Sequence, residues 1–150
     1  MDEQKFSLRV STDLKQSHQV QAWFDKSCAS VIETDRIRCK LALIEAFTNV
    51  VRHAHEELSQ DTPIDLEVTL SPYKLELRIW DFGIPFDFDN RLRAALKTLD
   101  DADGLTGGGR GLLIIYQGMD SVVSKRTEDG RNCLLMIKHL AQDDEEGERG

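Results

Sequence analysis

A column of polar side chains runs along one predicted helix. In the stretch IEAFTNVVRHA, residues 44–54, a carboxylate (Glu45), an amide (Asn49) and an imidazole (His53) follow one another at intervals of one helical turn. A carboxylate can accept a proton from a hydroxyl group or from water, and an amide oxygen can bind a hard cation such as Mg²⁺. The column fits a helix face that lines a cleft, and it also fits a face that is merely solvated.

A second candidate stretch, WDFGIPFD at residues 80–87, directly follows a predicted strand. The carboxylate of Asp81 can accept a hydrogen bond from the exocyclic amine of an adenine, and Gly83 allows a ligand to approach the backbone closely. The same residues also fit an ordinary turn in which the aspartate only caps the strand end. Taken alone, the stretch leaves both interpretations open.

A third candidate stretch, GLTGGGRGLLIIYQGM at residues 104–119, places four glycines around Arg110 and directly ahead of an apolar helix. Free N–H groups at a helix start suit a bound phosphate, and Arg110 adds a fixed positive charge. A flexible linker before a helix is the alternative. The stretch is not a Walker loop, because no Gly-Lys-Ser/Thr follows, and no strand precedes it as in a Rossmann fingerprint.

Two helices are predicted before residue 63. The segment KFSLRV alternates as a strand does up to Val10, and Ser11, Thr12 or Asp13 can cap a helix that runs to about Ile32. Apolar residues with helical spacing then predict a long amphipathic helix that ends before Pro63; they occupy positions 37, 41, 44, 47, 51, 54 and 58. The predicted centre of this apolar stripe, with the polar column on the opposite face, is formed by Leu41, Ile44, Phe47 and Val51.

Two hairpins are predicted in the second half of the chain. The segments IDLEVTL and KLELRIW alternate with period two around SPYK, and SVVSKRT and NCLLMIKHL flank EDGR, where Asp129 and Gly130 suit positive φ. A helix over LLIIYQGM lies between the hairpins. The order strand, helix, helix, hairpin, helix, hairpin predicts an α+β fold, a two-layer α/β sandwich with helices on one face of a mainly antiparallel sheet.

Composition limits the organisation of the chain and its partners. The 150 residues, 40% of them hydrophobic, predict one domain over residues 1–140, followed by an acidic, disordered tail at 141–150. With 27 acidic and 19 basic residues the net charge is −8, which disfavours direct binding to nucleic acid. Three unpaired cysteines and the short apolar runs predict a cytoplasmic protein that does not associate with membranes.

The three candidate stretches together resemble a known family. Glu-x-x-x-Asn on a helix, Asp-x-Gly-x-Pro after a strand and Gly-Gly-x-Gly-Leu before a helix, in this order, resemble the Bergerat-fold (GHKL, histidine-kinase-like) ATPases. The closer resemblance is to their anti-sigma-factor serine-protein kinase branch, the partner-switching kinases, and it covers residues 5–140. It implies the Bergerat fold, ATP and Mg²⁺ as cofactors, and transfer of the γ-phosphoryl group to a protein serine.

The resemblance also implies a role for single residues. It makes Glu45 the general base that activates the partner's serine hydroxyl, and Asn49 a nucleotide-site residue that ligates Mg²⁺. Asp81 would bind the adenine amine, and Gly83 would give the base room. The segment from about 88 to 108 would form a lid over the nucleotide. The residues at the phosphates would be Gly109, Arg110, Gly111 and Leu112.

Two positions receive no role from the resemblance. His53 matches a position that is often His in this branch, but no chemical function follows. Asn132 stands where the family usually keeps a Thr or Ser near the adenine, which is a departure from the pattern.

Partners follow from the same resemblance. They are an anti-sigma-factor antagonist with a phosphorylatable serine, a sigma factor or equivalent regulator that the chain sequesters, and a second copy of the chain in a homodimer. The expected dimer contact is an exposed sheet edge or the first helix, with Trp23 and Phe24. Two alternatives stay open: a non-catalytic ATP-binding module that sequesters a protein partner, and a protein that binds no nucleotide. An intact Glu45 favours the kinase.

Overall fold

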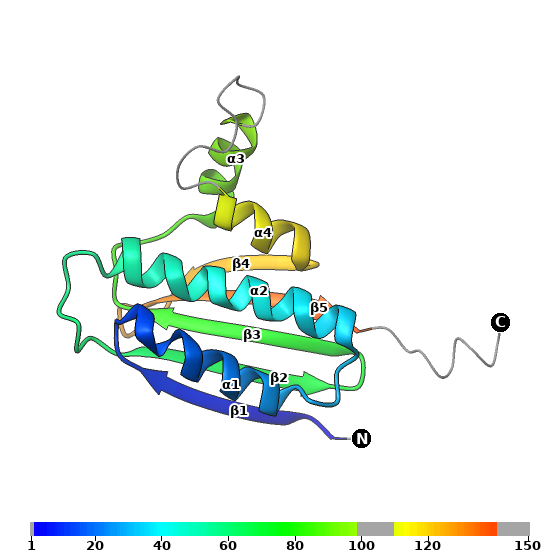
Figure 1. Ribbon diagram of the computed structural model, residues 1–150. Coiled ribbons are helices and arrows are strands. Elements are labelled where there is room, and N and C mark those ends of the chain that lie inside the picture. The colour runs from blue at the N-terminus through cyan, green and yellow to red at the C-terminus, as the bar shows by residue number, and fades with distance from the viewer. Residues whose placement is uncertain (1, 99–109, 141–150) are drawn as a thin grey trace, which may run out of the picture.

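A single antiparallel sheet organises the part of the chain that the computed structural model describes, residues 2–98 and 110–140 (Figure 1). Each strand pairs antiparallel with its neighbours, and both predicted hairpins, β2–β3 and β4–β5, are confirmed. In spatial order the strands are β1 (Gln4–Val10), β2 (Ile64–Ser71), β3 (Lys74–Asp81), β5 (Asn132–His139) and β4 (Ser121–Arg126).

Helices cover one face of this sheet, which confirms the predicted α+β two-layer sandwich (Figure 1). The described α-helices are α1 (Ser17–Ser27), α2 (Glu33–Asn49), α3 (Phe88–Thr98) and α4 (Arg110–Gly118). A 3₁₀ turn, η1 (Leu14–Gln16), precedes α1, and a π-helical turn, η2 (Val50–Ala54), continues α2. Helices α1, α2 and α4 lie over the sheet, whereas α3 projects beyond the start of α4.

The first helix is shorter than predicted. Asp13 does cap a helical turn, because its carboxylate accepts a hydrogen bond from Lys15 N at 2.9 Å. However, α1 ends at Ser27 rather than near residue 32, since both Cys28 and Val31 enter the core and the chain must turn between them. Ile32, in extended conformation, then caps α2.

Helix α3 was not predicted, because residues 88–108 were interpreted as a lid. Its buried residues Phe88, Leu92 and Ala95 have the i, i+4, i+7 spacing of a helix stripe. Charged residues surround this short stripe and made it inconspicuous in the sequence. The first part of the expected lid is therefore helical, and residues 99–108 lie outside the described part of the chain.

The predicted apolar stripe of α2 was only partly right: Phe47 is buried, and Ile44 and Val51 pack partly against the core. Leu41 is 52% exposed, whereas the helix turns a different row of residues to the core. That row consists of Cys39, Ala42, Leu43, Ala46, Phe47 and Val50. The small side chains of this row are buried because the helix is enclosed between the sheet and its neighbouring helices. The size of an apolar side chain was therefore a poor guide to its burial. Glu45 and Asn49 therefore lie beside the core, on the α4 side, and not opposite it.

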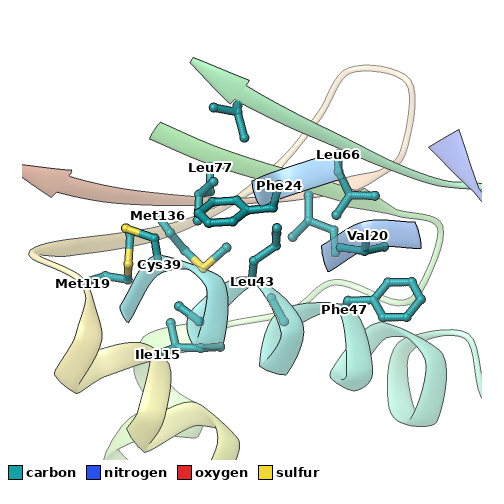
Figure 2. Packing of buried hydrophobic residues seen from close by; sticks show 14 of the residues in the cluster. Val20, Phe24, Cys39, Leu43, Phe47, Leu66, Leu77, Ile115, Met119 and Met136 are labelled. Carbon is teal, nitrogen blue, oxygen red and sulfur yellow. The ribbon is translucent and has the colours of Figure 1, made fainter. Parts of the chain in front are cut away.

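The core fills the space between the helices and the sheet (Figure 2). Phe24 of α1 and Leu43 of α2 meet Leu77 and Met136 from the central strands, and Ile115 of α4 closes the far side. The three cysteines are buried free thiols, and burial raises the pKa of Cys28 and of Cys39 to about 12. The thiols of Cys28 and Cys39 are therefore protonated at neutral pH.

The β4–β5 turn supplies a test of backbone conformation. Gly130 has φ of +83°, and an added Cβ would meet no atom within 4 Å; the predicted positive φ at Asp129 is not found. Replacing Gly130 with alanine should therefore lower the free energy of unfolding by about 1–2 kcal/mol through backbone strain alone. Urea unfolding measures this effect. Gly130→Asn is the control, because asparagine tolerates this conformation better, and equal midpoints for all three proteins would contradict the account.

Candidate functional site

A pocket of about 390 Å³ opens between α2, η2, α3, α4 and the ends of β3 and β5. Its apolar walls include Ile79, Leu112, Ile115 and Leu134, and its charged lining side chains among the described residues are Asp81 and Arg91. Size and apolar character are typical of a site for a small organic ligand with a few polar anchors. The pocket therefore brings together residues from all three candidate stretches.

Asp81 is a polar anchor in this pocket. It is 8% exposed, and its Oδ1 accepts hydrogen bonds from Gly83 N at 2.8 Å and from Asn132 Nδ2 at 2.9 Å. Within the described residues no hydrogen bond occupies its other oxygen, Oδ2, and no buried side-chain polar atom lacks a partner. Oδ2 must then be open to the pocket, where it can accept a hydrogen bond from a ligand.

Gly83 has a packing role in addition to any contact with a ligand. A Cβ at this position would lie 2.7 Å from the carbonyl oxygen of Ala54 in η2 and 3.1 Å from Asp81 Oδ1. The loop after β3 therefore rests directly on η2, and only glycine permits this approach.

Glu45 and Asn49 face the beginning of α4. A Cβ added to Gly111 would lie 2.6 Å from Glu45 Oε1 and 3.7 Å from Asn49 Oδ1. Both side chains are half-buried, and the first and third candidate stretches thus meet across the α2–α4 contact. Arg110 starts α4 and is exposed, Leu112 lines the pocket, and Gly109 lies outside the described residues.

The amide oxygen of Asn49 at this contact suits a magnesium ion that binds with a phosphorylated ligand. Mg²⁺ commonly takes only one or two protein oxygens and completes its octahedron with water and phosphate. Asn49 Oδ1, which faces the start of α4, offers one such oxygen. No group of three or more His, Cys, Asp or Glu residues in the described chain could hold a metal by itself.

Asn132 organises the loop that contains Asp81. It pairs with Asp81 in the β3–β5 register and is 5% exposed; its Nδ2 lies within hydrogen-bond distance of Asp81 Oδ1, Gly83 O and Ile84 O. Arg126 Nη1 reaches Asn132 Oδ1 at 3.2 Å and Gly83 O at 2.9 Å. The departure at Asn132 thus supplies an amide that fixes the Asp81 loop. Arg126 was missed, because no local pattern marks it.

Comparison with known proteins identifies the family. A sequence model of the histidine kinase-like ATPase domain matches residues 10–138. The chain belongs to this family. Serine-protein kinase RsbW of Listeria innocua is 34% identical over 103 residues, which are 67% of this chain and 64% of that protein. RsbW of Halalkalibacterium halodurans is 36% identical over 108 residues, 70% of this chain and 63% of that protein.

The chain therefore spans just under two thirds of the length of these two relatives. Among solved structures, a mycobacterial sensor histidine kinase, MprB, matches with a TM-score of 0.53 at 12% identity, covering 90% of this chain and 98% of that chain. That likeness concerns the fold alone. Together the comparisons confirm the resemblance to the histidine kinase-like ATPases and to their serine-protein kinase branch.

Two further residues, Arg91 and His53, line the pocket. Arg91 of α3 lines the pocket, and its guanidinium lies 5.3 Å from the centre of the Phe86 ring. The sequence did not identify Arg91 as a site residue, because helix α3 was not predicted. His53 lies on the lining as well and is exposed, so the third member of the polar column reaches the pocket without an assigned role.

Proposed function

We propose that the chain is an ATP-dependent protein serine kinase and anti-sigma regulator. It phosphorylates a serine of a small anti-sigma-factor antagonist, sequesters a sigma factor or equivalent regulator, and so controls transcription by switching partners. The observation that carries the proposal is the Glu45 carboxylate, held against Gly111 at the start of α4 beside a pocket that contains Asp81. Membership of an ATPase family and the similarity to RsbW proteins support it.

In this proposal, different residues of the pocket bind the adenine and the phosphates. The open Oδ2 of Asp81 accepts the exocyclic amine of adenine, and Ile79 and Leu134 pack against the base. The phosphates then lie toward the start of α4, where the backbone N–H groups of the glycine stretch and Arg110 stabilise their charge. The residues proposed here are Gly109, Arg110, Gly111 and Leu112.

Glu45 acts on the incoming serine. Its carboxylate accepts the hydroxyl proton as the serine oxygen attacks the γ-phosphorus, and ADP leaves. Asn49 holds Mg²⁺, which when bound neutralises charge on the phosphates. The alternative, a module that binds ATP and sequesters a partner without catalysis, leaves the position of Glu45 against Gly111 unexplained.

The proposed homodimer needs a revised contact. Phe24 is fully buried in the core and Trp23 packs partly against it, so the first helix does not offer this pair as an exposed contact. The outer strands of the described sheet, β1 and β4, remain as candidate edges. A cytoplasmic location and the absence of nucleic-acid partners belong to the proposal. No helix in the described ranges is long and apolar enough to cross a membrane.

Transfer of labelled phosphate tests the proposed activity. The full chain is incubated with γ-labelled ATP, Mg²⁺ and a small single-domain antagonist encoded beside its gene. We expect one serine of the antagonist to be labelled, and its replacement by alanine to abolish labelling. ATP binding without any transfer to candidate antagonists would favour the non-catalytic alternative.

Gly111→Ala tests the contact between Glu45 and α4. The added Cβ would meet the far end of the Glu45 side chain at 2.6 Å, so the carboxylate must move while the fold is kept. Phosphotransfer should fall by about tenfold or more, because even small misplacement of a catalytic group is costly. The single-turnover rate measures this. Gly118→Ala on the same helix is the control, since its nearest contact is 3.4 Å, and equal rates for both variants would contradict the account.

A further inference from the structure

A buried histidine, His55, connects the end of the α2–η2 helix with the loop at residues 81–83. It lies outside the three candidate stretches. His55, 1% exposed, follows η2 directly. Its Nδ1 lies 2.8 Å from Thr12 Oγ1, and its Nε2 lies 2.8 Å from the backbone nitrogen of Phe82. Phe82 stands between Asp81 and Gly83, so the imidazole contacts the loop that we propose to bind adenine.

The hydrogen bonds fix the tautomer of this imidazole. Phe82 N can only donate, so His55 Nε2 must be the unprotonated nitrogen that accepts. The Thr12 hydroxyl donates its single proton to Thr62 O at 2.7 Å, so it must accept from His55 Nδ1–H. The ring is thus neutral with its proton on Nδ1, and a doubly protonated ring could not accept from Phe82.

The π-helical turn explains why residue 55 points inward. His55 N donates to Val50 O at 2.8 Å, an i to i+5 bond that places residue 55 above the buried Val50. In a regular α-helix residue 55 would lie about 140° away from residue 50, on the outer face. The extra residue in this turn therefore directs His55 into the interior, toward the end of β3.

The loop after β3 is thereby attached at two adjacent points to η2 and the residue that follows it, which continue α2. One is the close approach of Gly83 to Ala54 O, and the other is the hydrogen bond from Phe82 N to His55. The same helix carries Glu45 and Asn49. We propose that His55 is a positioning residue, which holds the Asp81–Gly83 loop in its ATP-binding conformation through the Phe82 N–H bond. The inference rests on the proposed role of Asp81 at the adenine.

The charge state of His55 links this contact to pH. Burial lowers the pKa of His55 from its ordinary value of 6.5, and the Asp81 carboxylate, the charged group that acts on the ring, opposes this effect. The hydrogen-bond partners of the ring, the Thr12 hydroxyl and the backbone N–H of Phe82, carry no charge. The neutral ring therefore stabilises the fold fully above the unfolded pKa, and this stabilisation is lost as pH falls through the lower folded pKa.

Paired variants separate the contact with Phe82 from the contact with Thr12. In His55→Gln the side-chain oxygen can replace Nε2 as acceptor for Phe82 N. In His55→Asn the amide can replace only Nδ1–H, and the donor at Phe82 is left unpaired. Calorimetric titration of each folded protein with ATP and Mg²⁺ at neutral pH should show about tenfold weaker binding for His55→Asn, and near-native binding for His55→Gln.

ATP affinity measured over a series of pH values distinguishes a positioning histidine from a merely structural one, because a merely structural histidine would not change this dependence. ATP affinity of the native chain should fall as the solution is acidified through the folded pKa of His55, whereas His55→Gln should lack this component. Ring ¹⁵N spectra of the native chain should show one histidine with its proton on Nδ1. Equal affinity for His55→Asn and His55→Gln, or a proton on Nε2, would overturn the inference.

Asp81→Asn, titrated in parallel, distinguishes failure of this inference from failure of the proposed function. Loss of ATP binding in Asp81→Asn with unchanged binding in both His55 variants would refute the positioning role alone. Native affinity in Asp81→Asn would refute the adenine assignment itself, and the His55 inference with it. Thermal unfolding of every variant confirms that the titrated proteins are folded.

Discussion

Replacing Glu45 with alanine is expected to abolish phosphotransfer while ATP still binds. A positioned general base contributes about 10²- to 10⁴-fold to a reaction rate, so transfer in the variant should fall by at least the lower value. Binding should persist, because Glu45 is not among the described residues that line the pocket. Single-turnover transfer from labelled ATP to the antagonist measures the first effect, and calorimetry measures the second.

Two further variants make this result specific. Glu45→Gln keeps the shape of the side chain against Gly111 and removes only its basicity, so it should be as inactive as Glu45→Ala. Glu57→Ala removes an exposed carboxylate beyond the same helix and should transfer phosphate at the native rate. Unchanged transfer by either Glu45 variant would remove Glu45 from the mechanism.

Replacing Asp81 with asparagine is expected to weaken ATP binding by about tenfold to a hundredfold. The variant can keep its oxygen for Gly83 N and Asn132, so the loop should hold. Its NH₂ group then replaces Oδ2 in the pocket and meets the adenine amine, so two donors face each other with no acceptor between them. A charge-assisted hydrogen bond is thereby lost and a repulsive contact is gained.

Inosine triphosphate makes the Asp81 test specific to the base. It carries a carbonyl oxygen in place of the exocyclic amine, so the native chain should prefer ATP, and Asp81→Asn should lose or reverse that preference. Competition between the two nucleotides measures the ratio directly. Asp61→Asn, at an exposed site, is the control. An unchanged preference for ATP over inosine triphosphate in Asp81→Asn would show that the base does not bind at Asp81.

Much of the fold was predictable because the sheet is amphipathic. Strand β3 buries every second residue, as Leu75 and Leu77 show, and β2 does the same except that Thr69 is buried as well. Alternation together with the short SPYK link therefore located the first hairpin. Helix α2 was located correctly, but its buried face was predicted only in part. Cys39, Ala42 and Ala46 face the core while the larger Leu41 is exposed, and the position of neighbouring helices decides this, which is not a local property of the sequence.

The candidate site was predictable to the extent that its residues lie in short stretches. The resemblance named Asp81 and Asn49, and the structure brings both to one pocket. Arg126 and His55 were missed for a different reason. Each forms a hydrogen bond with the backbone of a loop that is distant in the sequence. For His55 this contact also depends on a π-helical turn, which no residue pattern predicts.

Calorimetric titration of the native chain with ATP in Mg²⁺, with Asp81→Asn alongside, tests the central claim most directly and needs no knowledge of the protein partner. We predict saturable binding at one site per chain for the native protein and a clear loss of affinity in the variant. Absence of binding by the folded native chain, or equal binding by both proteins, would contradict an ATP pocket built around Asp81.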